Sequence, residues 1–304
     1  MKQRSPALAF FGLVCAVWRS SHALQSIVSR RAVFSAGASS IALVLRSNPA
    51  LALSPDPSSL LSLIPPMRFG APATNATIPQ DLALKIETLA ASLEALSTHN
   101  NAQSPLLNGS WRLVYSNGPE ITSLAAKLPL GFCLGKTFQP LDTSAGFFEN
   151  GASIEHVFHL AKLQTNVVGD VRIAKPGSLN AAGVLNDKGN RVDVNFRIIT
   201  FQLDEIVGMP VLIRKAFTPK VNREAAQPAN DITYLDKTMR IVRGGEGSLF
   251  IFERDQSADT APMLTVAERN VLFGASGADV AVGSVGTAKM STSPELQFLF
   301  QGEK

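Results

Sequence analysis

Late in the chain lies the segment Tyr234-Leu-Asp-Lys-Thr-Met-Arg-Ile-Val-Arg-Gly-Gly-Glu-Gly-Ser-Leu-Phe-Ile-Phe252. Apolar residues alternate with polar ones around Ile241, and a second dense run of branched and aromatic side chains begins at Leu249. The glycines between the two runs can take a positive φ without steric cost, as a tight turn requires. The segment therefore predicts a β-hairpin whose apolar face must pack on another part of the chain.

A segment earlier in the chain offers that surface. It reads Leu107-Asn-Gly-Ser-Trp-Arg-Leu-Val-Tyr-Ser116. Side chains alternate between the two faces of a β-strand, so Trp111, Leu113 and Tyr115 are expected on one apolar face. We expect this strand and the late hairpin to meet in space.

Together the two segments resemble the opening strand and the late hairpin of the plastid lipid-associated protein (fibrillin) family. The resemblance covers about residues 79 to 255 and implies a mainly β, lipocalin-like antiparallel β-barrel that associates with plastid lipids. Gly109 and Trp111 also resemble the lipocalin opening motif, in which a late arginine stacks across the tryptophan and closes the barrel base. Arg240 and Arg243 are the candidates for this structural contact.

Composition and charge limit the possible functions. The chain has 304 residues, of which 45% are hydrophobic, so it has ample material for a core. The net charge is +4, but residues 1–52 contain six Lys or Arg and no acidic residue. The rest of the chain therefore has 22 basic residues against 24 acidic ones. Because nucleic-acid binding needs a basic surface, we expect no nucleic-acid partner.

Residues 1–52 read as a multipartite targeting presequence. An apolar run over residues 7–17 ends at the small-residue exit Ala23 and resembles a secretory signal peptide. Arg30 and Arg31 then open a second, twin-arginine-like signal with a cleavage-like exit at Ala52. One long membrane anchor is the alternative, although arginines interrupt the apolar stretch. Two signals in series predict delivery to a plastid, into the thylakoid lumen or to the thylakoid or plastoglobule surface.

The remaining chain divides into three further parts. Residues 53–78 are rich in proline and predict a linker, residues 79–255 the family domain, and residues 256–304 a loosely ordered tail. Within the domain, apolar residues spaced by three and four predict an amphipathic helix that runs from Asp81 to about Thr98. We expect this helix to cap the open end of the barrel, and its apolar stripe could instead lie on a membrane.

Alternation also identifies residues that could line a hydrophobic cavity. The strand over residues 192–198 places one set of apolar side chains on one face, and the strand at 249–252 has a second set. The candidates for contact with a lipid or hydrophobic ligand in these strands are Val192, Val194, Phe196, Ile198, Phe250 and Phe252.

Two less regular segments could contact lipid as well. An aromatic loop contains Phe132, Phe138, Phe147 and Phe148. These side chains could plug the core, serve as a lid, or dip into an acyl layer. Residues 207–231 read as an insertion interrupted by proline, either an ordinary connection or a segment at a bilayer surface.

The sequence predicts no catalytic residue, no metal site and no cofactor. Cys15 lies in the presequence, so Cys133 has no partner for a disulfide in the mature chain. His156 and His159 point to opposite faces of a strand, which opposes a shared metal. Asp236 is close in sequence to Arg240. The two residues could act as an acid and base pair, but we favour an ion pair that stabilises the turn.

The expected function is therefore non-catalytic. The resemblance implies a protein that binds or coats thylakoid or plastoglobule lipids, with membrane lipids as partners. A barrel of this kind could also carry a small hydrophobic molecule such as a quinone, a carotenoid or a fatty acid. Two alternatives stay open: an enzyme on the same barrel that acts on a carotenoid or lipid, and an adaptor that holds a lipid-synthesising enzyme at the membrane.

Overall fold

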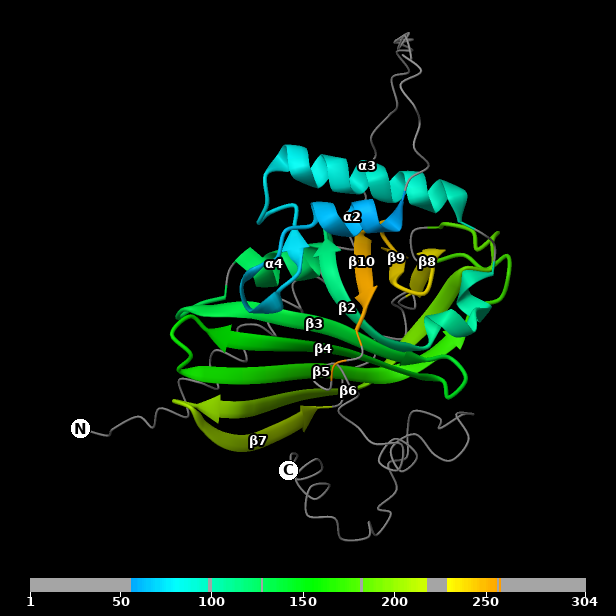
Figure 1. Ribbon diagram of the computed structural model, residues 1–304. Helices are drawn as coiled ribbons and strands as arrows, with labels where there is room; N and C mark the ends of the chain where they lie inside the picture. The colour runs from blue at the N-terminus through cyan, green and yellow to red at the C-terminus, as the bar shows by residue number, and fades with distance from the viewer. Residues whose placement is uncertain are drawn as a thin grey trace, which may run out of the picture. The chain divides into compact units, whose positions relative to one another are not determined.

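The computed structural model describes residues 56–97, 100–126, 128–180, 183–217, 229–255 and 257 (Figure 1). The predicted presequence lies outside these residues, as does nearly all of the predicted tail. The described chain begins with α2 (Pro57–Leu63), η2 (Arg68–Gly70), β1 (Ala73–Thr74), α3 (Gln80–Leu96), η3 (Asn101–Gln103) and η4 (Pro105–Leu107). It continues with β2 (Gly109–Ser116), α4 (Pro119–Ala126), β3 (Phe132–Asp142), β4 (Phe147–His156), β5 (Ala161–Ile173), β6 (Arg191–Ile206), β7 (Met209–Phe217), β8 (Ala229–Leu235), β9 (Met239–Gly244) and β10 (Leu249–Arg254).

Eight antiparallel strands close into a barrel. Their order is β2-β10-β9-β8-β6-β5-β4-β3, and β3 pairs back onto β2. Two strands lie outside the ring, since β1 pairs in parallel with β2 and β7 pairs with β6. The mainly β, lipocalin-like barrel predicted from the sequence is confirmed. The late hairpin, now β9 and β10, and the early strand β2 are neighbours in its wall, as expected.

The interior of the ring is an apolar core to which all eight strands contribute. Trp111 and Leu113 face this core, but Tyr115 does not. A bulge at Val114 explains the difference, because Ile251 pairs with Tyr115 while the next residue, Phe252, pairs with Leu113. The extra residue reverses the alternation of β2. The expectation of one shared face was therefore wrong for Tyr115, which packs outside the barrel.

Helix α3 is present as predicted, but it covers the wall of the barrel and not an open end. Its buried residues Ile86, Ala90 and Leu93 share a cluster with Met239 and Ile241 of β9. These two strand residues point outward because their neighbours, including Val242, belong to the interior core. An apolar stripe therefore packs on an apolar outer face (Figure 1).

The 3-10 helices η3 and η4 bring apolar residues to one end of the barrel. Ala102 and Leu107 belong to the interior core and are fully buried. The indole N–H of Trp111 donates to the carbonyl oxygen of Leu107 over 2.9 Å, which satisfies a polar group that would otherwise be buried alone. The beginning of β2 is thus tied to the segment that precedes it.

Three segments are more regular than the sequence predicted. The aromatic loop is the hairpin β3–β4, with Phe132 and Phe138 in β3 and Phe147 and Phe148 in β4. The insertion at 207–231 contains β7, which adds to β6. The predicted linker contains α2, where Pro57 occupies the first turn, which tolerates proline, and Leu60 enters the core under α3.

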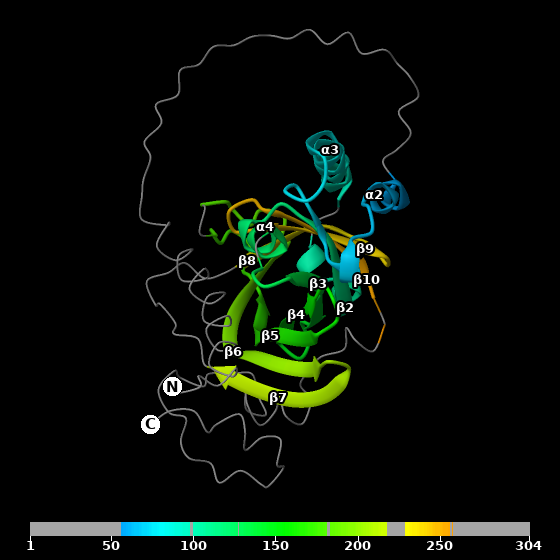
Figure 2. The ribbon, with the colours of Figure 1, turned by 90° about the vertical axis from the view of Figure 1, so that its left-hand side faces the viewer.

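Four strands of the ring continue beyond it. β2 pairs with β3 only over residues 109–112, and β8 pairs with β6 only at residues 191–193. Past these two seams, β3, β4, β5 and β6 stay paired with one another and β7 joins them. We call this part of the sheet the extension. It lies towards the left in Figure 1 and faces the viewer in Figure 2.

Candidate functional site

The inner face of the extension is apolar and continuous with the barrel core. Phe148 faces the core, so residues an even number of positions along β4, including Ile154, lie on the same face. Ile154 is paired with Leu134 on β3 and with Leu163 on β5, and Leu163 is paired with Leu203 on β6. Paired residues lie on the same face of the sheet. We call it the open inner face, and its members are Leu134, Ala152, Ile154, Leu163, Thr165, Val167, Ile199, Phe201 and Leu203.

One row of the open inner face carries small side chains. Thr137, Ala152 and Thr165 are directly opposite one another on three neighbouring strands. The rows on either side carry larger apolar residues, such as Ile154 and Val167, which are only partly buried. Partly exposed branched side chains around a row of small ones make this row the candidate position for an apolar ligand.

The row that contains Val167, one step closer to the closed ring, also carries polar side chains. Gln139 donates from Nε2 to Oδ1 of Asn150 over 2.7 Å and accepts, at Oε1, an N–H from Arg240 over 2.5 Å. Arg240 is fully buried, and its Nε and Nη1 atoms have no hydrogen-bond partner among the described residues. A buried cation with two unsatisfied donors is rare in proteins and suits an oxygen acceptor from a ligand.

Aromatic rings stabilise the buried charge of Arg240. Its guanidinium lies 4.9 Å from the ring centre of Trp111 and 4.3 Å from that of Phe252, close enough for cation–π contact with both. Burial, together with the nearby charge of Arg254, lowers the pKa of Arg240 to about 9. The guanidinium therefore stays protonated at neutral pH.

The structure separates the two candidate arginines of the barrel base. Arg240 lies against Trp111, whereas Arg243 lies on the outer side of the wall. Arg243 forms two hydrogen bonds of 2.8 Å to the carboxylate of Glu94 on α3. Gly109 has a φ of +128° and a side chain there would meet Arg254, whose guanidinium lies 4.1 Å from the Trp111 ring. Arg254, which was not among the candidates, thus takes the second position beside Trp111.

The residues predicted to contact a ligand occupy several environments. Val192, Val194 and Phe252 are tightly packed in the core, and Phe196 and Phe250 are partly buried at its edge. Ile198 lies beyond a bulge in β6 and shares a face with Val168, opposite to that of Phe196. Phe138 packs against Gly151 on that same opposite face, and Phe132 contacts the ring of His156.

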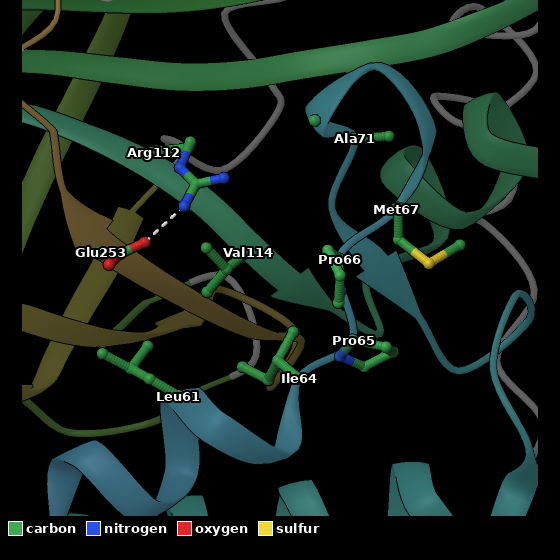
Figure 3. Close-up of a pocket in the computed structure, with 10 residues that line it drawn as sticks. Leu61, Ile64, Pro65, Pro66, Met67, Ala71, Arg112, Val114 and Glu253 are labelled. Atoms are coloured by element: carbon green, nitrogen blue, oxygen red, sulfur yellow. Dashed lines mark hydrogen bonds and ion pairs between the residues drawn. The ribbon is translucent and has the colours of Figure 1, made fainter.

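The outer side of the wall has a small pocket of its own (Figure 3). It has a volume of about 190 Å³ and lies between the segment that follows α2 and strands β2 and β10. Leu61, Ile64, Pro65 and Val114 line it, and the ion pair of Arg112 with Glu253 lies beside Val114 (Figure 3). Ligand sites usually exceed about 300 Å³, so this pocket is small for a lipid.

Other chemistry is sparse in the described part of the chain. No group of three or more His, Cys, Asp or Glu residues there could hold a metal ion. None of the described helices has the length and apolar character needed to cross a membrane. Asp236 does not pair with Arg240 as the sequence suggested, because its carboxylate accepts N–H bonds from Thr238 and Met239 of 2.6 and 2.7 Å. Although burial raises the pKa of Asp236, these bonds outweigh it and lower that pKa.

Sequence reasoning missed most of the open inner face. Ile154 and Leu163 lie in segments that were read as strands, but their position depends on which strands extend past the seams. Phe201 and Leu203 follow the bulge in β6. The phase shift near Ile199 was the one visible signal.

A comparison with known families agrees with this architecture. The model of the PAP_fibrillin family matches residues 58–253, which is more than half of the chain and includes α2, α3 and most of the barrel. No curated protein matches the chain. With the family match, the barrel and the paired motifs, the chain belongs to the PAP_fibrillin family of plastid lipid-associated proteins.

Proposed function

We propose that the protein is a non-catalytic lipid-binding protein that carries one small apolar molecule on the open inner face of its barrel. The observation that carries the proposal is the partly exposed apolar surface that continues from the core past the two seams. Members of the family are generally structural proteins. The expected location is the plastid, at the thylakoid or plastoglobule surface or in the thylakoid lumen.

The polar groups at the inner end of this face suggest the class of ligand. Arg240 offers two buried donor nitrogens, Nε and Nη1, and Gln139 and Asn150 lie beside it. A ligand with an apolar chain and an oxygen-bearing end, such as a fatty acid or a prenylated quinone, would place its oxygen at these donors. Satisfying a buried donor contributes more free energy of binding than a contact at the surface.

Filling the row of small residues should weaken ligand binding. We expect Ala152→Phe to raise the Kd for a fluorescent fatty-acid or quinone analogue about tenfold or more, because overpacking costs about 1–3 kcal/mol. Ala145→Phe, in the exposed β3–β4 turn, is the matched control and should leave the Kd unchanged. Fluorescence titration measures both. Equal Kd values for wild type and Ala152→Phe would show that the ligand does not bind on the open inner face.

Arg240 should distinguish ligands by their polar end. We expect the wild-type protein to bind a fatty acid more tightly than its methyl ester, and Arg240→Met to lose most of that preference, because charged hydrogen bonds contribute about 1.5–3 kcal/mol. Competition titrations with the two ligands give the ratio of Kd values. A ratio that Arg240→Met leaves unchanged would show that the ligand's polar end lies elsewhere.

A further inference from the structure

The extension ends in three turns that form one continuous apolar edge. The N–H of Val157 donates to the carbonyl oxygen of Gly131 over 2.8 Å, and the N–H of Val207 donates to that of Leu160 over 2.9 Å. These bonds join the loop before β3, the β4–β5 turn and the β6–β7 turn side by side. The apolar rim, as we call it, consists of Leu130, Phe158, Leu160, Ile206, Val207 and Met209. The β4–β5 and β6–β7 turns that carry the rim lie on the side of the sheet that faces the viewer in Figure 2.

Large apolar side chains are concentrated and exposed on this rim. Phe158 is 77% exposed, Leu130 is 75% exposed, and Val207 and Met209 are each 64% exposed. The six rim residues make up six of the fifteen exposed large hydrophobic residues in the described part of the chain. Isolated exposed leucines are ordinary, whereas a cluster at adjoining turn tips marks a surface that contacts something apolar.

Two residues of the rim have backbone angles that bulky apolar residues rarely adopt. Val207 and Gly208 form a two-residue turn between the paired Ile206 and Met209, with φ angles of 48° and 77°. Such turns favour Asn-Gly, because a β-branched residue at positive φ is strained. Leu130 also has a positive φ, of 58°. The sequence thus keeps an apolar side chain where turn chemistry favours a polar one.

The charges behind the rim are balanced. Lys162 is paired across the sheet with Glu155 on one side and Glu205 on the other. Arg68 reaches the rim and donates to the carbonyl oxygen of Val157 over 2.5 Å. These groups can meet both charges of a zwitterionic headgroup, and they supply no excess positive charge to attract an anionic surface.

We propose that the apolar rim inserts into the surface of a lipid layer and admits the ligand to the open inner face. The inference rests on the proposed lipid-binding function. A cluster of exposed apolar side chains at turn tips suits the fluid boundary between headgroups and acyl chains, because a lipid layer does not need a shape that complements the protein. The strands that end in the rim also carry Ile154, Leu163 and Leu203, so an apolar molecule could pass from the layer to the inner face without crossing water.

A flotation assay with phosphatidylcholine vesicles tests the proposal on the full chain. The double variant Phe158→Ser and Val207→Asn should bind these vesicles about tenfold or more weakly than wild type, since it removes two exposed apolar side chains whose burial in the lipid layer favours binding. The control Leu84→Gln removes a leucine of α3 that is 65% exposed, and it should float like wild type. Raising the salt concentration should change wild-type flotation little.

The variants also separate lost lipid contact from lost folding. Val207→Asn alone should raise the Tm while it weakens flotation, because asparagine tolerates the positive φ of the turn. Wild-type binding that disappears at high salt, or a double variant that floats as well as wild type, would overturn insertion of the rim. If ligand titration in solution still responds to Ala152→Phe in that case, the rim assignment fails while the proposed function stands. If wild type neither floats nor binds the analogues, both fail.

Discussion

Replacing Trp111 by alanine should lower the free energy of unfolding by about 3–5 kcal/mol, the range for deleting a large buried aromatic side chain. Trp111 is fully buried, and it lies in the core to which all eight strands contribute. The substitution would also remove the cation–π contact between Trp111 and the buried guanidinium of Arg240. It would break the hydrogen bond from the indole N–H to the carbonyl oxygen of Leu107 as well. Urea or thermal unfolding measures the effect.

The matched control for Trp111 is an aromatic residue on the surface. Phe158→Ala removes a side chain that is 77% exposed, so it should change the free energy of unfolding by less than about 0.5 kcal/mol. If Trp111→Ala were as mild as this control, Trp111 would not hold the base of the barrel together.

The second large effect concerns the seam between β6 and β8. Asp231→Asn should destabilise the fold by about 3–5 kcal/mol, because it leaves the charge of Arg191 buried without its carboxylate partner. Arg191 has a side chain only 1% exposed and makes two bonds to Asp231, of 2.6 and 2.9 Å. Among the described residues, β6 and β8 pair at three positions, so each pair matters to closure of the ring. Chemical denaturation gives the value.

Asp170→Asn is the matched control for Asp231→Asn. Asp170 also pairs with an arginine, Arg197, but that side chain is 24% exposed, and the pair lies between β5 and β6 where pairing is long. Water screens and solvates a partly exposed arginine, so we expect a loss of less than about 1 kcal/mol. Equal effects of the two substitutions would mean that the β6–β8 seam has no special role in closing the barrel.

The sequence predicts the part of this fold that depends on local patterns. The late hairpin, the Trp111 strand and α3 follow from alternation, glycine placement and helical spacing, and each is present. The contact between Trp111 and Arg240 followed from resemblance to a known motif, since 129 residues separate the two in the chain.

The rest depends on registers that one sequence does not reveal. The bulge at Val114 turns Tyr115 outward, and the short seams let β3 to β6 run on as the extension. These features depend on pairing between distant segments, and one extra residue reverses every later side chain. Because these registers were unknown, the predicted ligand contacts centred on Val194, which is buried in the core, and missed the partly exposed Ile154 and Ile199.

Photo-crosslinking with a fatty-acid analogue that carries a diazirine on its acyl chain tests the central claim most directly. The purified full chain is loaded with the analogue and irradiated, and peptide mass spectrometry locates the labelled residues. We expect labels on β4, β5 and β6 at positions of the open inner face, such as Ile154, Val167 and Ile199, and fewer labels in Ala152→Phe. Labels confined to the outer pocket around Leu61, Ile64 and Val114, or spread over the surface without dependence on Ala152, would contradict it.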